Sequence, residues 1–382
     1  MAKIKYILTH PIQYQVPLIR YLTTKGIDLT VLYRSNFNLN KHLDKGFKKK
    51  ISWSTNLLGG YKYKFLSYIG KNQVNNLYPI TTNFYKDILD RNTDIIFLHG
   101  IKTWYNIIII FLAKIFNKKV FVREEFHKYS KYRNNLNILI NKFFFKIIDP
   151  FIDIYLAIGS KNRQYYIENS IDKKKIVQMP YVVDNKIFYQ KRTNKIGEKI
   201  KLLYAGKLIK RKGINILLKS ILLLNQKKRV KNKFELTIVG DGYMKNELSK
   251  FISLNRLDNV KIIAFKNEKD LAKIYKKTDI FIMPSYYEPW GLTVNEALAS
   301  QNAVICSNKV GSSFDLVKNE FNGYKFKEKN YKDLASKMYI LISNRKKLQK
   351  FKNNGLKIIS KWSFRECYEG INKAIRKVSN QT

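Results

Sequence analysis

DIFIMPSYYEPWGLTVNEALAS, residues 279–300, combines three kinds of local sequence in one short stretch. The apolar run 279–285 is typical of a buried strand, YYEPWG of a loop, and LTVNEALAS of a helix. Ligands bind at the carboxyl ends of parallel strands, near helix N-termini whose N–H groups favour anions. Glu288 on the loop and Glu296, about one turn into the helix, are therefore predicted to face the same crevice.

Short β-rich runs alternate with segments of helical period on both sides of this stretch, which predicts parallel sheets covered by helices. The pattern occurs twice, and 382 residues exceed what one hydrophobic core usually holds. A polar, lysine-rich segment at 182–201 separates the two series, as a linker would. We predict an α/β fold with an N-terminal domain at 1–187, a C-terminal domain at 188–361, and a final helix in 362–382 that packs back toward the N-terminal domain. The predicted strands lie at 4–10, 28–34, 94–100, 119–125 and 153–159 in the first series and at 199–208, 234–242, 260–265, 279–285 and 303–308 in the second.

The composition favours some classes of protein over others. The formal net charge is +45, from 73 Lys and Arg against 28 Asp and Glu. Abundant Lys, Asn, Ile and Tyr are also what an A- and T-rich coding sequence produces, so the charge alone does not indicate a function. A nucleic-acid-binding protein would concentrate basic and aromatic residues on one module. Here they are spread along the chain, and we predict no nucleic-acid partner.

Several features bear on where the protein works. Cys306 and Cys367 cannot form a disulfide framework, and no cysteine pair has metal-ligand spacing. The N-terminus MAKIKYILTHPIQ is typical of a strand rather than a signal peptide, and the longest uncharged apolar run, 107–113, is too short to span a bilayer. We therefore predict a cytoplasmic protein. The segment 127–148 interleaves Lys and Arg with apolar residues, which predicts either a helix on the anionic inner face of the membrane or a core helix with a basic outer side.

The loop after the first strand of the second series has the composition of a phosphate site. YAGKLIKRKG (204–213) places Gly206 at a strand end and Lys207 and Lys212 on the loop, and a phosphate needs both cations and close backbone approach. The next strand ends in Gly240 and Asp241 in the same way. An ordinary basic turn and tight strand-to-helix packing would also produce these two patterns.

The two glutamates suit a different part of the same ligand. A carboxylate accepts two hydrogen bonds side by side, as the vicinal hydroxyls of a ribose or a hexose require. Glu288 and Glu296 on either side of a helix start that binds a diphosphate would hold the sugars of a nucleotide sugar. The alternative is a helix with acidic residues near its N-terminus. Trp290 and Tyr287 are expected to shape the sugar pocket.

At this point the sequence resembles the family 4 retaining glycosyltransferases, which have the GT-B fold of two Rossmann-like domains facing across a cleft. Glu288 and Glu296, with seven residues between them in a PSxYEPWGLTxNEA context, resemble the family's signature. The resemblance implies that Glu296 binds the nucleotide ribose and Glu288 the donor sugar, with Lys207 and Lys212 on the diphosphate. It further implies a donor site that includes the backbone at Gly206, Gly240, Asp241, Gly291, Leu292 and Thr293. The family usually has Arg where Lys207 stands. The ammonium group of Lys207 therefore replaces a guanidinium that could donate two parallel hydrogen bonds to a phosphate.

THPIQYQVPLIRYL (9–22) resembles the first strand and helix of a subgroup associated with bacterial surface-polysaccharide synthesis. His10, Gln13 and Tyr14 are expected to face the cleft on its acceptor side. Many members have a cleft histidine after a middle strand of this domain. Here VFVREEFH offers His127 and Glu124 as candidate catalytic residues beside Arg123 and Glu125, and IIFLHG offers His99; the sequence leaves the choice open.

The resemblance implies transfer of a sugar from a UDP- or GDP-type donor to a glycan acceptor, which in such pathways is often lipid-linked. The acceptor hydroxyl would attack from the face that the nucleotide diphosphate leaves, and cations would stabilise the departing phosphate. The resemblance also implies that neither a metal nor another cofactor is needed, and no DxD motif follows a strand here. Alternative functions are a nucleotide-sugar epimerase of the same fold and a basic nucleic-acid-binding protein.

Overall fold

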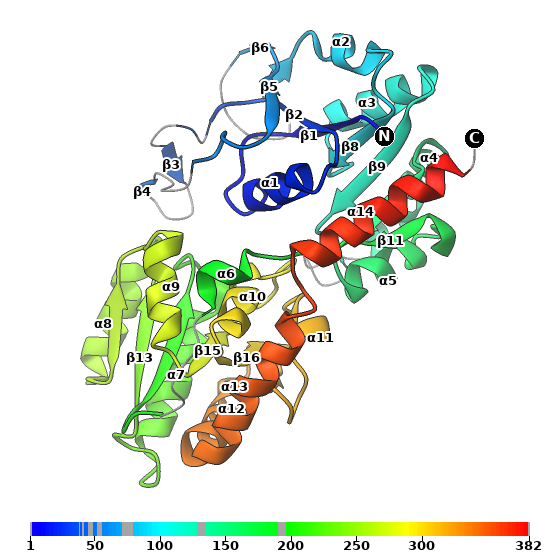
Figure 1. Cartoon of the computed structure of the whole chain (residues 1–382). Helices are drawn as coiled ribbons and strands as arrows, with labels where there is room; N and C mark the ends of the chain where they lie inside the picture. Colours follow the sequence, from blue (N-terminus) through cyan, green and yellow to red (C-terminus); the bar gives the residue numbers. More distant parts are fainter. Residues whose placement is uncertain are drawn as a thin grey trace.

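A computed structural model of the chain describes residues 2–37, 39, 42–44, 49–51, 56–70, 79–127, 135–189 and 196–380. The polypeptide forms two α/β domains, drawn one above the other in Figure 1. Each domain is built on one parallel sheet, so the predicted fold class is confirmed.

The N-terminal sheet has seven strands in the order β11-β10-β9-β8-β1-β2-β5. Its central strands β1 and β8 are mostly apolar and buried because helices cover both faces of the sheet, and β9 is apolar between Lys119 and Arg123. The strands are β1 (Ile4–Leu8), β2 (Leu29–Tyr33), β5 (Lys62–Phe65), β8 (Ile95–His99), β9 (Lys119–Glu124), β10 (Ile154–Ala157) and β11 (Ile176–Gln178). Two antiparallel pairs lie apart from the sheet: β3 (His42–Asp44) with β4 (Lys49–Ile51), and β6 (Tyr68–Ile69) with β7 (Ile80–Thr81). The helices are α1 (Val16–Thr24), α2 (Phe84–Leu89), α3 (Trp104–Ile115), α4 (Asn135–Ile148) and α5 (Ser160–Glu168), with 3-10 turns at Asp149–Phe151 and Lys173–Lys175.

The C-terminal sheet has six strands in the order β14-β13-β12-β15-β16-β17. The strands are β12 (Ile200–Ala205), β13 (Phe234–Val239), β14 (Val260–Ile263), β15 (Ile280–Met283), β16 (Ala303–Ser307) and β17 (Gly323–Phe326). The helices are α6 (Asn185–Phe188), α7 (Ile214–Asn225), α8 (Lys245–Leu254), α9 (Glu268–Lys276), α10 (Leu292–Ala299), α11 (Ser313–Leu316), α12 (Tyr331–Ser343) and α13 (Arg345–Ile359), with a 3-10 turn at Lys210–Lys212. The strand order reverses between β12 and β15, so the crevice for a ligand opens at their carboxyl ends.

The last helix, α14 (Phe364–Ser379), leaves the C-terminal domain and packs on the N-terminal one (Figure 1). Its buried side chains, Cys367, Ile371, Ala374 and Val378, belong to the same apolar core as strands β1, β2 and β10. Ser363 begins the helix with a capping box, in which Glu366 reaches back to the Ser363 backbone amide. The N-terminal domain is therefore completed by the end of the chain.

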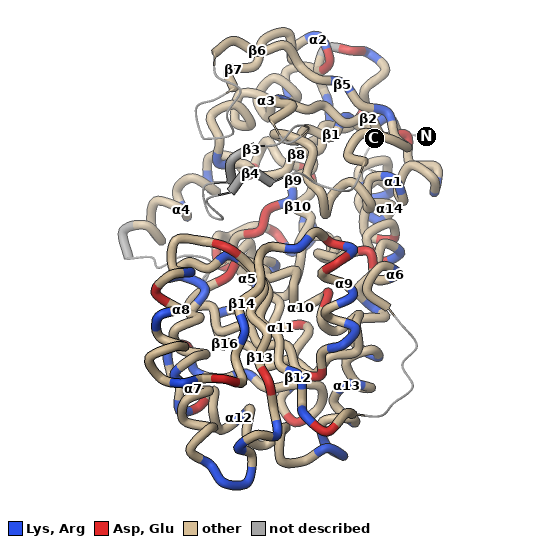
Figure 2. Tube along the Cα trace, turned by 90° about the vertical axis from the view of Figure 1, so that its left-hand side faces the viewer, with Lys and Arg blue, Asp and Glu red and all other residues tan. Residues whose placement is uncertain are grey.

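Basic residues are distributed over both domains in Figure 2 rather than along one band. No helix within the described ranges combines the length and hydrophobicity needed to cross a bilayer. Among those residues there is also no cluster of three His, Cys, Asp or Glu side chains arranged to hold a metal ion.

Candidate active site

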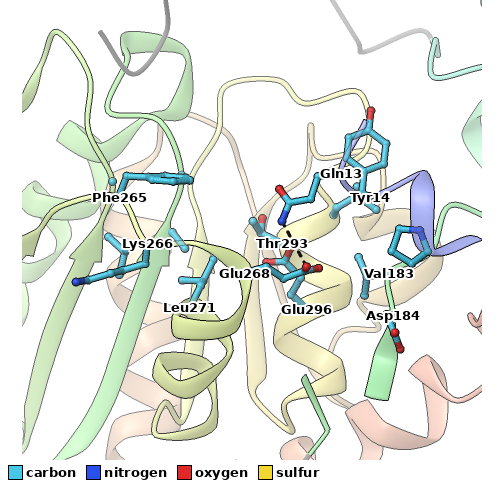
Figure 3. Close-up of a pocket in the computed structure, with 16 residues that line it drawn as sticks. Gln13, Tyr14, Val183, Asp184, Phe265, Lys266, Glu268, Leu271, Thr293 and Glu296 are labelled. Carbon is cyan, nitrogen blue, oxygen red and sulfur yellow. Dashed lines mark hydrogen bonds between the residues drawn. The ribbon is translucent and has the colours of Figure 1, made fainter. Parts of the chain in front are cut away.

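A cavity of about 240 Å³ lies between the two domains, at the carboxyl ends of β12 and β13. Figure 3 shows its walls, with Gln13 and Tyr14 from the N-terminal domain above Glu268 and Glu296 from the C-terminal domain. Its lining residues are Gln13, Tyr14, Pro17, Val183, Asp184, Ala205, Gly206, Val239, Gly240, Phe265, Lys266, Glu268, Leu271, Leu292, Thr293 and Glu296.

Two glycines allow the strand ends to form the floor of this cavity. Gly240 has φ +153°, and a Cβ atom there would lie 1.9 Å from the Gly206 carbonyl oxygen. Gly206 has φ +154°, also in the region that favours glycine. Both glycines line the cavity, so a ligand can approach the backbone closely.

Glu296 lies on α10 in the cavity wall, half-buried. Burial raises the pKa of its carboxyl from 4.5 to about 7, a hydrogen bond with Tyr275 opposes this rise, and the charge of Glu268 adds to it. Its buried atom Oε2 has no hydrogen-bond partner in the described part of the chain. A carboxylate held in this way favours a ligand that brings hydroxyl donors.

Glu288 lies on the loop before α10, next to the basic loop after β12. Its Oε2 accepts hydrogen bonds from Arg211 Nη1 at 2.9 Å and from Lys212 Nζ at 2.5 Å. The side chains of Glu288 and Lys212 are 12% and 14% exposed, so the pair is largely shielded from water. Burial lowers the pKa of Lys212, Glu288 opposes this effect, and the charges of Arg211 and Lys207 lower it further. Four charged groups therefore share one small region.

The N-terminus of α10 lies between these two glutamates. Gly291 precedes the helix at φ +92°, and a Cβ atom there would lie 2.9 Å from the Met283 side chain. Within the described ranges, the amides of Gly291, Leu292 and Thr293 donate no hydrogen bond. Such amides at a helix start form a site for an anion.

Lys207 and Asp241 occupy different settings at neighbouring strand ends. Lys207 is half-buried and close enough to Lys212 to lower that residue's pKa. Asp241 is buried, and its carboxylate accepts from Lys245 Nζ at 2.8 Å and from the Phe265 amide at 3.0 Å. The Asp241 side chain thus holds together the walls around the cavity, of which it is not a lining residue.

On the N-terminal side, the structure brings Gln13 and Tyr14 to the cavity and leaves His10 outside its lining. Gln13 Nε2 donates to Glu268 Oε2 at 3.4 Å, across the gap between the domains. His10 is half-buried, with its ring edge-on to Phe37 at 6.5 Å between centroids. Gln13 and Tyr14 thus form the N-terminal wall of the cavity that contains Glu296.

The other N-terminal candidates, Glu124 and His127, are 2% and 1% exposed. The Ile101 amide donates to Glu124 Oε1 at 2.8 Å, inside the domain. His127 Nε2 lies 3.3 Å from the backbone oxygen of Glu288, so His127 contacts the loop before α10 in the other domain.

Trp290 is not on the surface of a sugar pocket, contrary to our expectation. It is 3% exposed, donates through Nε1 to Asn295 Oδ1 at 2.9 Å, and stacks on Trp362 with 5.3 Å between ring centroids. Tyr181 contacts its edge. Trp290 therefore packs where the two domains and the final helix meet. The expected sugar-pocket partner Tyr287 lies under the Arg211 guanidinium, 5.3 Å from it.

Two site residues were missed by the sequence analysis. Glu268 follows β14 at the start of α9, and the strand-then-helix pattern there could have indicated it. Arg211 stands in the basic loop already singled out, but nothing in the sequence distinguished it from the lysines beside it.

The C-terminal part of the chain, residues 185–358, matches the family described as "Glycosyl transferases group 1". The uncharacterized glycosyltransferase MJ1178 of Methanocaldococcus jannaschii is 24% identical over 247 residues, covering 64% of this chain and 65% of that protein. A Campylobacter jejuni enzyme, N-acetylgalactosamine-N,N'-diacetylbacillosaminyl-diphospho-undecaprenol 4-alpha-N-acetylgalactosaminyltransferase, is 27% identical over 58% of this chain and 59% of its own length. The chain thus spans less than two thirds of the length of these curated relatives.

Solved structures share the fold over the whole chain. Sucrose-phosphate synthase from Thermosynechococcus elongatus superposes with a TM-score of 0.73 at 17% identity, covering 100% of both chains. Anabaena Alr3699/HepE in complex with UDP and glucose superposes with a TM-score of 0.72 at 13% identity, covering 98% of this chain and 100% of that one. These likenesses show that the fold is GT-B.

Proposed function

We propose that this protein is a retaining glycosyltransferase that transfers a sugar from a nucleotide diphosphate to a glycan acceptor. The observation that carries the proposal is the interdomain cavity, which places Glu296 and the amides that begin α10 beside two glycine-lined strand ends. The match of 185–358 to group 1 glycosyl transferases supports the same reading.

In the proposed complex, each part of the donor has its own partner. The ribose hydroxyls donate to Glu296, which is otherwise incompletely paired. The diphosphate lies at the N-terminus of α10, near Lys207 and Lys212. Glu288 accepts hydrogen bonds from the transferred sugar once the diphosphate attracts Lys212 away from it. The HepE complexes with UDP and with UDP and glucose show that a protein of this fold binds such ligands.

The proposed reaction breaks the bond between the anomeric carbon and the departing phosphate oxygen, which keeps the electron pair. The acceptor oxygen bonds to the anomeric carbon from the same face, and its proton goes to the departing phosphate. The positive charges and the helix N-terminus stabilise the charge that develops on that phosphate, so the chain's main contribution is electrostatic. The proposal uses no metal ion or other cofactor.

For the acceptor we propose a lipid-linked glycan at the inner face of the cytoplasmic membrane, in surface-polysaccharide synthesis. Two Campylobacter relatives are named for diphospho-undecaprenol substrates, and a Staphylococcus aureus relative, CapM, for capsular polysaccharide biosynthesis. These substrates are those of the relatives, and they suggest the chemical class of acceptor that we propose for this protein.

Helix α4 offers a surface for the membrane that carries such an acceptor. It lies at the edge of the N-terminal domain (Figure 2) and exposes Leu139 (65%), Phe143 (66%) and Ile147 (48%) at helical spacing. Lys142 and Lys146 are exposed beside them, and the helix contains no acidic residue. An apolar stripe flanked by lysines fits an anionic lipid surface. The segment 128–134, which the sequence analysis joined to this helix, lies outside the described residues.

Calorimetry with UDP- and GDP-sugars tests the donor proposal. We expect the wild type to bind at least one of them and Glu296→Ala to lose most of that affinity, while Glu247→Ala, an exposed glutamate on α8, leaves it unchanged. Equal binding by Glu296→Ala and wild type would contradict the site. Mass spectra of products with and without acceptor separate transfer from epimerisation, because an epimerase needs no acceptor.

Co-sedimentation with anionic vesicles tests the membrane proposal separately. Phosphatidylglycerol vesicles should pellet the wild type and fail to pellet a variant carrying Lys142→Gln, Lys146→Gln and Phe143→Ser. Exposed lysines on the C-terminal domain, Lys227 and Lys228, provide a control with the same loss of charge. Equal pelleting of both variants would show that the attraction comes from net charge and not from α4.

A further inference from the structure

A second polar cluster lies on the N-terminal side of the cleft, where β8 and β9 end. Its centre is the carboxylate of Glu125, whose Oε1 accepts hydrogen bonds from the hydroxyls of Tyr14, at 3.4 Å, and Tyr181. The imidazole Nε2 of His99 lies 3.7 Å from the same oxygen. The other ring nitrogen of His99, Nδ1, is 3.3 Å from the Tyr6 hydroxyl, which fixes the ring. Three side chains from separate segments thus hold one carboxylate, and Tyr6 holds one of the three, His99.

This carboxylate is only partly covered. The Glu125 side chain is 32% exposed and that of His99 is 17% exposed. By contrast, its chain neighbours Glu124 and His127 are 2% and 1% exposed. Within the described ranges, Glu125 Oε2 accepts no hydrogen bond from the protein. One oxygen is therefore saturated and the other remains available to a ligand.

The charge on Glu125 is maintained in this setting. Burial alone would raise the pKa of the carboxyl, but the hydrogen bond and charge of His99, with the Tyr181 hydroxyl and the Arg123 charge, bring it below its usual value. An ionised carboxylate is a strong acceptor for neutral hydroxyls and repels phosphate. The chemistry of the cluster thus favours a sugar over a second diphosphate.

The cluster is next to the donor cavity but outside it. Tyr14 lines the cavity and its hydroxyl donates to Glu125, so one ring separates the two places. Two residues after Glu125, His127 contacts the backbone of Glu288 on the donor-sugar loop. A group bound at Glu125 would therefore lie near the expected position of the transferred sugar, on the opposite domain.

We propose that Glu125, held by His99 and Tyr14, is the binding site for a hydroxyl of the acceptor sugar. This inference rests on the proposed function and proposes Glu125 where the sequence left the choice among the N-terminal candidates open. Glu124 and His127 are interior residues in this arrangement, whereas Glu125 presents an oxygen to the cleft.

The test compares Glu125→Gln with the wild type. The variant keeps the shape of the side chain and removes its charge. Donors are the nucleotide sugars that the wild type binds, and acceptors are para-nitrophenyl glycosides of glucose, galactose and N-acetylglucosamine. We expect kcat/KM for the acceptor to fall by about 10- to 100-fold, the usual effect of losing a hydrogen bond to a charged group. The Kd for UDP should change less than about threefold, because Glu125 does not line the donor cavity.

The control is Glu168→Gln, an exposed glutamate on α5 of the same domain, which should leave both quantities unchanged. His99→Gln should share the acceptor defect, since it removes the imidazole that orients Glu125. If the wild type modifies none of the glycosides, inhibition of donor hydrolysis by the glycosides replaces transfer and should weaken in Glu125→Gln, whereas the rate of hydrolysis itself should change less than about threefold, because water does not need an acceptor-sugar site.

Unchanged rates in Glu125→Gln would overturn the inference. So would a loss of UDP affinity as large as the loss of rate, since that pattern marks a donor-binding or purely structural residue. A wild type that binds no nucleotide sugar would instead overturn the proposed function, so the two failures are distinguishable. The thermal unfolding temperature of each variant is also measured. A variant that unfolds at the same temperature as the wild type has kept its fold, so its loss of rate has another cause.

Discussion

Replacing Glu296 by glutamine should stabilise the free protein at high pH while weakening the proposed binding of the ribose. The carboxyl has its pKa raised from 4.5 to about 7 by burial and by the charge of Glu268. At about 1.4 kcal/mol for each tenfold change in proton affinity, the ionised form costs the folded protein about 3 kcal/mol above pH 7. Because the side chain is only half-buried, we expect between about 1 and 3 kcal/mol.

The effect has a definite direction with pH. At about pH 4 the carboxyl is largely protonated in both the folded and the unfolded chain, so wild type and Glu296→Gln differ little. As the pH rises past 4.5, the unfolded wild type releases its proton first and the folded state loses stability until the pH passes about 7. The free-energy advantage of the variant should therefore grow from pH 5 to pH 8.

Urea unfolding followed by tryptophan fluorescence at several pH values measures this difference. Glu247→Gln, which changes an exposed glutamate on α8, serves as the control and should show a difference that does not vary with pH. The reasoning would be refuted if the gain in free energy of unfolding of Glu296→Gln over the wild type were constant from pH 5 to pH 8, or largest at pH 5.

Three further substitutions test other parts of the site. Lys212→Met leaves Glu288 with one cation fewer and should weaken UDP binding by about tenfold or more in calorimetry; unchanged affinity would contradict the placement of the diphosphate. Gly240→Ala places a Cβ atom 1.9 Å from the Gly206 oxygen and should lower the free energy of unfolding by about 1–3 kcal/mol or more, measured in urea. Trp290→Ala should lower the free energy of unfolding by about 3–5 kcal/mol. Because Trp290 is buried, the substitution should leave the choice of donor sugar unchanged. Altered selectivity among donor sugars would show that Trp290 does shape the sugar pocket.

Most of the fold could be predicted because the central strands are continuous apolar runs. β8, β10 and β15 are buried on both faces, so their sequences differ plainly from the polar segments around them. Three edge strands were missed: β5 reads KYKF and is mostly exposed, while β11 and β17 have only three and four residues. An edge strand has one neighbour and less apolar contact, so its sequence carries a weaker signal.

The C-terminal half of the site could be predicted because it is local. The elements that hold Glu288, Gly291 and Glu296 follow one another within 279–300, so the order of residues almost determines their relative positions. The N-terminal half could not, because Arg123, Glu124 and Glu125 come one after another at the end of β9 and the sheet is covered on both faces. Which side chain reaches the cleft then depends on the neighbouring strands and not on the alternation along β9.

The two glutamates of the proposed donor site are in opposite electrostatic conditions in the free protein, and a nucleotide sugar would change both. Glu288 is paired with Arg211 and Lys212, whereas Glu296 is opposed by the charge of Glu268. A diphosphate competes with Glu288 for Lys212, so binding requires that ion pair to loosen, and the sugar hydroxyls must compensate Glu288 for its lost partner. Ribose hydroxyls, in contrast, would donate to the ionised form of Glu296. Binding of the ribose near pH 7 should therefore make the Glu296 carboxyl release its proton. We therefore expect the proposed site to discriminate against free phosphate, which would break the Glu288 pair without supplying hydroxyls to either carboxylate.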